Sequence, residues 1–418
     1  MLLKLMKAAF VSATMLSASG VATLAADATL WAPSHRQGWV EPLVKAFNES
    51  HDDKITLTIV PQHQMVTKAG AAISGNVGPD AVVLDVIYTP TFAASGQLED
   101  VTDYIDSLSY KDKFSPGHLQ AATYNGRFYG VPFSADASIL IYNKDLFRKA
   151  GLDPETPPKD FAEIKSFAEK ITALGDETYG FYFVGNAAGL MAFSAQPVVW
   201  AGGGQLIDEK TNEATVSSSP GVRDMLTFYH DLWDSGLVHP SAESDDGKTL
   251  YAPFGQGKVG IAIAGSRILA AIKSQAPAEL DVGAGFVVGK DGKTSAFATG
   301  DSLVIVKASP HADVIKEFAS WAAEPDNQIK FLMEGGILSP RVDLPLDKLT
   351  ALPETSILAY KSLPAGKTPW VIGYDDIFNT PQGPWLQMLQ TAIFDGDIDT
   401  ALEDGQAGFE AVLKRHSN

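Results

Sequence analysis

The stretch VPFSADASILIYNKDLF, residues 131–147, gives the most direct information about the fold. It opens with the chain-stiffening Pro132, continues through a polar segment that contains Asp136, and ends in the apolar run 139–142 before Asn143. An apolar run of this length between turn-forming residues is typical of a strand buried in a sheet. The question is why an aspartate stands immediately before a strand that must be buried.

The chain has 418 residues, more than one hydrophobic core usually supports, so we expect two domains. Its 45% hydrophobic and 20% charged residues are typical of a soluble globular protein. Acidic side chains outnumber basic ones by 50 to 32, which gives a formal net charge of −18. This charge argues against nucleic acid or an anionic membrane surface as the partner.

The N-terminus has the pattern of an export signal. Lys4 and Lys7 precede an apolar, small-residue stretch with no acidic residue, which predicts a signal peptide over 1–26 that is cleaved near residues 25–28. No later stretch approaches the ~18 unbroken apolar residues of a membrane helix. The chain contains no cysteine, which excludes disulfides, thiolate metal sites and a lipid on an N-terminal cysteine. We therefore expect a free periplasmic protein.

Strand and helix patterns alternate along the chain. Strands are predicted at 28–33, 54–60, 79–86, 139–142, 258–265 and 301–306. Helices are predicted at about 39–47, 65–73, 157–174, 222–233, 311–323, 325–334, 384–394 and 399–415, with Asp160 capping the third of them. This alternation predicts an α/β fold whose sheets are mostly parallel.

Motifs for catalysis and cofactor binding are missing. The Gly-Lys-Thr triplets at 247, 292 and 366 lack the glycine that a phosphate loop needs five residues earlier. There is no metalloprotease or nucleophile-elbow motif, and the eight histidines form no ligand-like cluster. We expect a binding protein without a cofactor or a bound metal. A glycosidase needs only a suitably placed carboxylate pair, so a secreted carbohydrate-active enzyme remains the alternative.

Several segments together resemble the solute-binding proteins of ABC importers, specifically the carbohydrate-binding group that includes maltose-binding protein. The matching segments run in family order and cover nearly the whole mature chain: GNVGPDAVVLDVIYTPTFAASGQLEDVTDYI (75–105), YNGRFYGVPFSADASILIYNKDLFRKAGL (124–152), PPKDFAEIKSFAEKIT (157–172), FGQGKVGIAIAGS (254–266) and GGILSPR (335–341). The resemblance is specific for the family and not for a ligand.

The resemblance implies a two-lobed α/β fold with a ligand cleft between the lobes. Residues 27–134 plus 301–341 would form the N-terminal lobe, and residues 138–298 plus 345–418 the C-terminal lobe. The chain would cross between lobes at 131–137, 297–301 and 341–346. Asp136 would then lie at the cleft mouth, where related proteins place an acid that accepts hydrogen bonds from sugar hydroxyls. The alternative is that Asp136 caps a turn or pairs with a lysine.

Further candidates follow from the rule that ligands of α/β sheets bind beyond the carboxyl ends of strands. In the N-terminal lobe these strand-end residues are His35, Arg36, Gln37, Gln62, His63, Gln64, Asp85 and Tyr88. In the C-terminal lobe the candidates are Asn186, Trp200, Gly265, Ser266 and, more loosely, Trp370. Aromatic faces suit the C–H face of a sugar, although core packing explains most tryptophans.

Arg267 departs from the family pattern, which commonly has an aromatic residue there. With Arg36 or Arg341 it would favour a ligand that carries a carboxylate, sulfonate or phosphate. A salt bridge to one of the 50 acidic side chains is the alternative.

The sequence thus predicts a monomeric periplasmic receptor, not an enzyme. It would capture a sugar or sugar derivative, neutral or anionic, and deliver it to the transmembrane subunits of an ABC permease. A binder of a non-sugar in the same fold, such as a glycerol phosphoester or a polyamine, is a further alternative.

Overall fold

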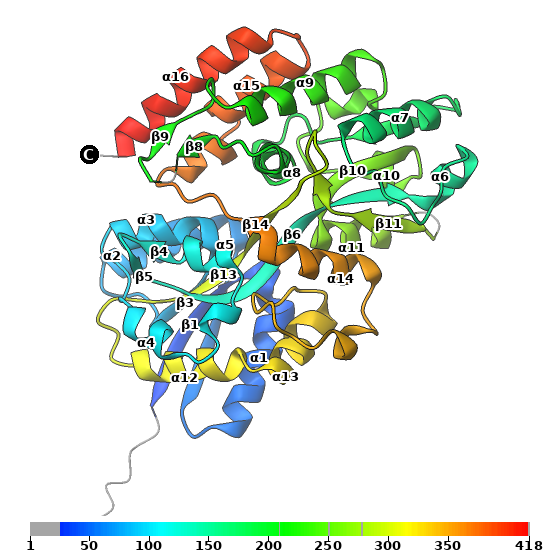
Figure 1. The fold of residues 1–418 in the computed structure, drawn as a ribbon. Helices are drawn as coiled ribbons and strands as arrows, with labels where there is room; N and C mark the ends of the chain where they lie inside the picture. The colour runs from blue at the N-terminus through cyan, green and yellow to red at the C-terminus, as the bar shows by residue number, and fades with distance from the viewer. Residues whose placement is uncertain (1–25, 209, 250, 277–278, 417–418) are drawn as a thin grey trace, which may run out of the picture.

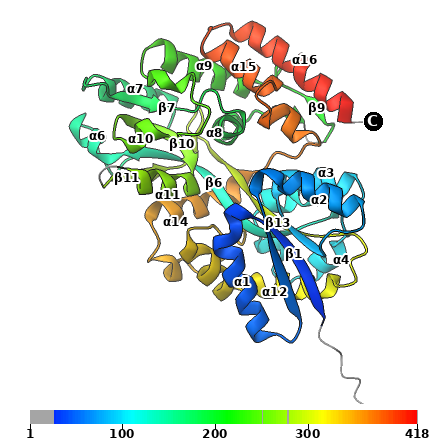
Figure 2. The ribbon, with the colours of Figure 1, turned by 180° about the vertical axis from the view of Figure 1, so that it is seen from behind.

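The computed structural model describes residues 26–208, 210–249, 251–276 and 279–416, and the predicted signal peptide lies outside them apart from Ala26. Figures 1 and 2 show two bodies, one above the other, joined by strands that run through both. The C-terminal helix lies on the upper body and the described N-terminus on the lower one. None of the described helices combines the length and apolar character that a bilayer-spanning helix requires.

The lower body is built on three parallel strands: β1 (Asp27–Pro33), β2 (Lys54–Val60) and β3 (Ala81–Asp85). Helices α1 (Gln37–Ser50) and α12 (Ala312–Ala322) turn their apolar faces to this sheet. A second cluster packs under α2 (Met65–Ser74). Each helix buries a stripe spaced by three or four residues, as in Trp39, Val40, Leu43 and Phe47, and this spacing is the pattern that predicted α1.

The upper body surrounds β7 (Tyr179–Tyr182) and β10 (Val259–Gly265). Its helices include α7 (Phe161–Thr172), α8 (Ala188–Ala201), α9 (Pro220–Asp234), α15 (Pro384–Ile393) and α16 (Ile398–His416). The predicted cap of α7 is confirmed, because Asp160 accepts a hydrogen bond from the backbone N–H of Glu163 at 2.8 Å. Helix α8 is apolar on most sides because other elements cover it.

Two long antiparallel strands, β6 (Val131–Asn143) and β13 (Thr294–Ile305), join the bodies. They pair with each other, while β6 also pairs with β10 above and β13 with β3 below. Every residue of β6 is buried, so the polar segment around Asp136 is not a loop: the strand starts at Val131 and not at Ile139 as predicted. The predicted division into lobes stays a prediction, although the two cores meet at these strands.

The sheet is mixed rather than mostly parallel. Its strand order is β2-β1-β3-β13-β6-β10-β7, and the two crossing strands run antiparallel to β3, β10 and each other. Along this order the parallel pairs, β1 with β2 and β3 and β7 with β10, lie at the two ends, and the short β14 (Gly366–Lys367) pairs parallel with β13 off this path. The alternation of strands and helices identified the ends of the sheet correctly and missed the direction of the strands that connect them.

Shorter elements complete the fold. They are α3 (Thr89–Ala94), α4 (Thr102–Ser107), α5 (Pro116–Ala121), β4 (Thr123–Tyr124), β5 (Arg127–Phe128), α6 (Lys144–Lys149), β8 (Ile207–Asp208), β9 (Glu213–Ala214), α10 (Ala252–Gly255), α11 (Ser266–Gln275), β11 (Val282–Gly285), β12 (Val287–Val288), α14 (Glu354–Ser362) and β14 (Gly366–Lys367). The helix predicted over 325–334 is broken into α13 (Pro325–Asn327), a π turn (Gln328–Leu332) and a 3-10 turn (Met333–Gly335).

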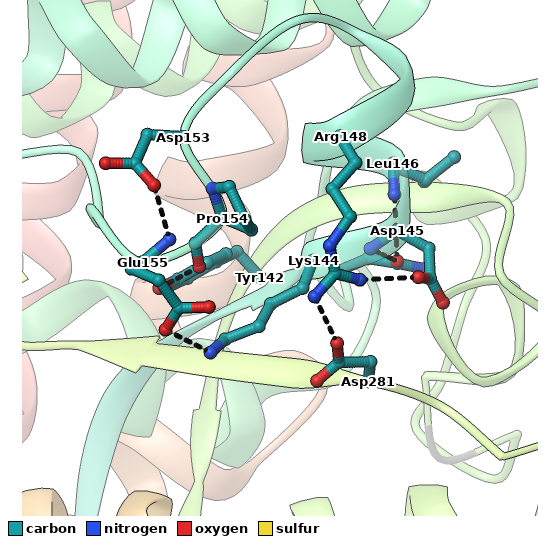
Figure 3. A network of polar contacts seen from close by, with 10 residues as sticks. Tyr142, Lys144, Asp145, Leu146, Arg148, Asp153, Pro154, Glu155 and Asp281 are labelled. Atoms are coloured by element: carbon teal, nitrogen blue, oxygen red, sulfur yellow. Dashed lines mark hydrogen bonds and ion pairs between the residues drawn. The ribbon is translucent and has the colours of Figure 1, made fainter.

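The stretch of residues 131–147 ends in a network of polar contacts (Figure 3). The Asn143 side chain caps α6 by accepting from the backbone N–H groups of Asp145 and Leu146. Arg148 bonds Asp145 and Asp281, each at 2.7 Å, and so ties α6 to the segment that leads into β11. These contacts fix the upper end of β6 on the second body.

Gly300 provides a test of the crossing strands. It lies in β13 with a φ of 152°, and an added Cβ would come within 2.0 Å of the Ser134 carbonyl oxygen on β6. We predict that Gly300→Ala lowers the free energy of unfolding by about 1–3 kcal/mol, because the paired strands must separate or strain. Gly38→Ala in α1, where no atom lies within 4 Å, is the control and should leave stability unchanged or slightly raised. Equal urea midpoints for both variants would contradict this account.

Candidate ligand-binding cleft

A cleft of about 1040 Å³ lies between the two bodies. Its lower wall is formed at the ends of β1, β2 and β3, and β13 crosses its floor. Its upper wall comes from the start of α8, the loop at 246–248 and the π turn η10 (Asp375–Asn379). Both walls mix polar and apolar side chains, an arrangement that suits a small polar ligand.

The lower wall holds five of the residues predicted from the sequence: His35, Gln62, His63, Asp85 and Tyr88. Because β1, β2 and β3 are parallel, their carboxyl ends meet at one edge of the sheet, and a 3-10 turn follows each of them directly. The strand-end rule therefore found the side chains that gather here. Their contact with a ligand stays a prediction.

Three other residues predicted in these turns do not line the cleft. Gln37 points along α1 and donates to Glu41 at 3.0 Å. Gln64 contacts the Nε2 atom of His63 at 3.1 Å and so lies next to the wall rather than in it. Arg36 points inward and is buried.

Arg36 and Asp301 form an ion pair under the floor of the cleft. The Arg36 Nε atom lies 2.9 Å from the Asp301 carboxylate, and both side chains are almost fully buried. Ser134 on β6 also donates a hydrogen bond to this carboxylate. The pair thus connects the end of β1 to both crossing strands, and it neutralises Asp301, which lines the cleft.

The pKa values of Asp85 and His35, two of the cleft residues, lie away from their usual ranges. Burial, followed by the nearby charge of Asp301, raises the pKa of Asp85 to about 7. Loss of water contact, followed by the charge of Arg36, lowers the pKa of His35 to about 4. At neutral pH the His35 ring is therefore uncharged and can both donate and accept hydrogen bonds.

Tyr88 spans the cleft. Its hydroxyl group donates to Asp375 Oδ1 at 2.9 Å, and Asp375 lies in η10 on the upper body. Asn379 supports the acceptor by donating to the same oxygen at 2.6 Å. Burial raises the pKa of Tyr88, so the hydroxyl group keeps its proton. This hydrogen bond directly joins the two walls.

The upper wall contains one predicted residue, Asn186, and several that the sequence did not reveal. Asn186 Oδ1 accepts from Gln390 at 3.1 Å. The residues that sequence reasoning missed include Phe193, Asp246, Lys248, Phe297, Thr299, Asp301, Asp375 and Asn379. The position of Asp301 in the cleft can be inferred once β13 is known to cross the floor. Phe193 gave no signal, because α8 is apolar on most sides.

Asp136, Gly265 and Ser266 form a buried group beside the cleft and do not line it. Asp136 accepts from Ser266 Oγ at 2.6 Å and from the backbone N–H of Ala137 at 2.9 Å. Burial raises the pKa of Asp136 to about 6. An added Cβ on Gly265 would lie 2.9 Å from the ring of Phe193, which does line the cleft. Asp136 therefore links β6 to the start of α11, and its role toward a ligand stays a prediction.

Trp200 and Trp370 lie behind the cleft. Trp200 packs against Phe297 with ring centroids 5.6 Å apart, and both tryptophans line a second cavity of only about 50 Å³. Trp370 donates to the carbonyl oxygen of Thr123 at 2.5 Å and stacks on Tyr124 at 6.4 Å. Trp370 thus connects the two bodies, and stacking of either indole on a ligand remains untested.

The three arginines that suggested an anionic ligand, Arg36, Arg267 and Arg341, do not line the cleft. Arg341 is buried, bonds Asp343 at 2.6 Å and 2.9 Å, and lies over the ring of Tyr110. Arg267 is half-buried at the start of α11. Both lie outside the walls described above.

A large cleft between two cores, lined from both and crossed by shared strands, defines a class of protein that encloses a small ligand between two lobes. The model of the family described as "Bacterial extracellular solute-binding protein" matches residues 32–329. The chain belongs to this family.

Individual proteins agree with this membership. A putative binding protein of Brucella abortus is 27% identical over 387 residues, 90% of each chain. The maltotriose-binding protein of Pyrococcus abyssi is 26% identical over 82% of this chain and 70% of its own length. A shorter match, 34% identical over a third of each chain, is the sn-glycerol-3-phosphate-binding periplasmic protein of Agrobacterium fabrum.

The fold agrees as well. The structure of the sugar-binding protein MalE from Xanthomonas citri superposes with a TM-score of 0.83 at 22% identity, covering 94% of this chain and 98% of that one.

The hydrogen bond across the cleft gives a test. We predict that Tyr88→Phe shifts the ligand-free chain toward a more open arrangement with a larger radius of gyration. A hydrogen bond to a charged acceptor is worth about 1.5–3 kcal/mol. The equilibrium ratio of the arrangement with contacting lobes to the open arrangement should therefore fall roughly tenfold or more. Tyr104→Phe is the control, since its hydroxyl group bonds Lys316 and Ser320 within the lower body. Identical small-angle scattering from the parent and both variants would contradict this role.

The buried ion pair gives a second test. Arg36→Met should destabilise the fold by about 3–5 kcal/mol, because Asp301 stays buried without its cation. Adding Asp301→Asn to Arg36→Met should recover part of this loss, since the unpaired charge is removed. Urea unfolding of the two variants measures both changes, and a double variant no more stable than the single one would refute the charge-burial explanation.

Proposed function

We propose that the protein is a periplasmic receptor that captures a sugar or sugar-like polyol in its cleft and delivers it to an ABC permease. The observation that carries the proposal is the cleft, about 1040 Å³ in volume and lined from both bodies. Ligand pockets of known proteins reach ~1,000 Å³, so a mono- or oligosaccharide would fit. The ligands for which the similar proteins are named, maltotriose and sugars among them, support this class.

The side chains in the cleft suit hydroxyl groups. Gln62, His63 and Asn186 offer both donors and acceptors, and Asp85 is an acceptor. The rings of Phe193 and Tyr374 give apolar surface for the C–H face of a sugar ring. The polar groups would fix the orientation of a sugar and the rings would add burial.

Capture without turnover fits the family, whose members are binding proteins. Binding between the walls would favour the closed arrangement, since a ligand that contacts both lobes binds the closed state better than the open one. A permease would then receive the closed, loaded form. The alternative of a secreted glycosidase predicts release of product from a bound glycan, which chromatography of the incubated sugar would detect.

A glycerol phosphoester is less well supported than a neutral sugar. Among the described residues, Lys248 is the one lysine or arginine that lines the cleft, and its side chain already bonds Asp246. A phosphate group calls for unpaired cationic donors. The partial match to a glycerol-phosphate-binding protein covers only a third of the chain.

A thermal-shift screen of the mature chain tests the proposal. We expect at least one sugar or polyol to raise the melting temperature, because a ligand at ~100 times its dissociation constant adds about 2.7 kcal/mol to stability. Neutral sugars, amino sugars, uronates, glycerol phosphate and spermidine form the panel. A shift with glycerol phosphate or spermidine and none with any sugar would overturn the sugar assignment.

A further inference from the structure

The charges that line the cleft do not balance. Its carboxylates among the described residues are Asp85, Asp246, Asp301 and Asp375. Asp301 pairs with Arg36 under the floor, and Asp246 bonds Lys248 at the rim, where both side chains are solvent-accessible. Two carboxylates remain, one on each wall.

Asp85 and Asp375 have no cationic partner within residues 26–208, 210–249, 251–276 and 279–416. Asp85 accepts from the backbone N–H of Ile87 at 3.3 Å. Asp375 accepts from Tyr88 and Asn379, which are neutral. Neutral donors orient a carboxylate without cancelling its charge. The nearby Arg36, which pairs with Asp301, opposes the charge of Asp85 only in part.

These two carboxylates come from opposite walls, so closing the cleft brings their like charges together and removes water from both. Each effect disfavours the ionised form. Burial, then Asp301, raises the pKa of Asp85 to about 7 against the opposing charge of Arg36, and Asp375 adds a smaller contribution to the rise. A positive charge between the walls would reverse both effects. A neutral ligand would satisfy hydrogen bonds and leave the repulsion.

Other sources of positive charge do not fit. No group of three or more metal-ligating side chains that could hold an ion is found in the part of the chain that the structure describes. Lys248 has a side chain that is 85% exposed and is already paired with Asp246. A cationic group on the ligand would supply the positive charge that these side chains do not provide.

We propose that the ligand is a sugar or polyol that carries a protonated amine, with the ammonium group held between Asp85 and Asp375. This inference rests on the proposed function, because it assumes that the cleft binds a sugar-like molecule. The hydroxyl groups of the ligand would meet Gln62, His63 and Asn186, which offer hydrogen-bond donors and acceptors on the same walls. Selectivity would then come from charge as well as from hydroxyl pattern.

Isothermal titration of the mature chain with matched pairs tests this directly. Glucosamine with glucose, galactosamine with galactose, mannosamine with mannose, and an amino-deoxy hexitol with its parent hexitol are compared, and glucuronate represents the anionic class. We expect an amine to bind at least tenfold more tightly than its neutral counterpart, and glucuronate to bind most weakly of all.

Variants assign the preference to the two carboxylates. Asp85→Asn and Asp375→Asn should each reduce the ratio of amine to neutral affinity about tenfold, because each substitution removes one of the two charges that would hold the ammonium group. Asp376→Asn is the matched control, since Asp376 neighbours Asp375 but pairs with His416 and Arg415 outside the cleft. Melting temperatures show whether each variant is folded. If one of the two variants does not fold, the other still tests the inference.

The outcomes separate the two proposals. Neutral sugars that bind as tightly as their amines, or an unchanged ratio in both Asp→Asn variants, would overturn the amine inference and leave the receptor function standing. Binding of spermidine with no binding of any sugar, amino sugar or polyol would overturn the proposed sugar function itself.

Discussion

The pairing of β6 with β13 is the constraint on which the rest of the structure depends. These strands are shared by both bodies, with β6 continuing into the upper sheet and β13 into the lower one. Because backbone groups in a buried strand must find partners within the sheet, the crossing cannot be an irregular linker. The two bodies are therefore joined through the sheet itself, and the cleft lies over the paired strands.

The chemistry of the cleft follows from this arrangement. Asp301 is delivered to the floor by β13, and its charge is neutralised from below by Arg36 at the end of β1. The parallel strands of the lower body place His63 and Asp85 on one wall, while the loops of the upper body place Asn186 and Asp375 opposite. Neither body alone has a complete site, and this explains why a ligand would couple to the separation of the bodies.

The sequence predicted the periodic elements better than the geometry of the crossing. The apolar stripe of α1 and the alternation in β2 are local signals, and both elements were found within a few residues. The position of Asp136 at the cleft mouth is what the resemblance to the family implies. In a strand buried on both faces, such as β6, alternation gives no information about which side chain faces the cleft. Phe193 and Asp375 depend on how distant segments pack, which one sequence cannot show.

The account is tested most directly by measuring the distance between the bodies. The chain has no cysteine, so Lys68→Cys in α2 and Glu403→Cys in α16 allow two spin labels at exposed positions. Pulsed electron resonance should give a distance distribution that shortens when a ligand found by titration saturates the cleft. An unchanged distribution at verified saturation would contradict the claim that the two bodies close on a ligand between them.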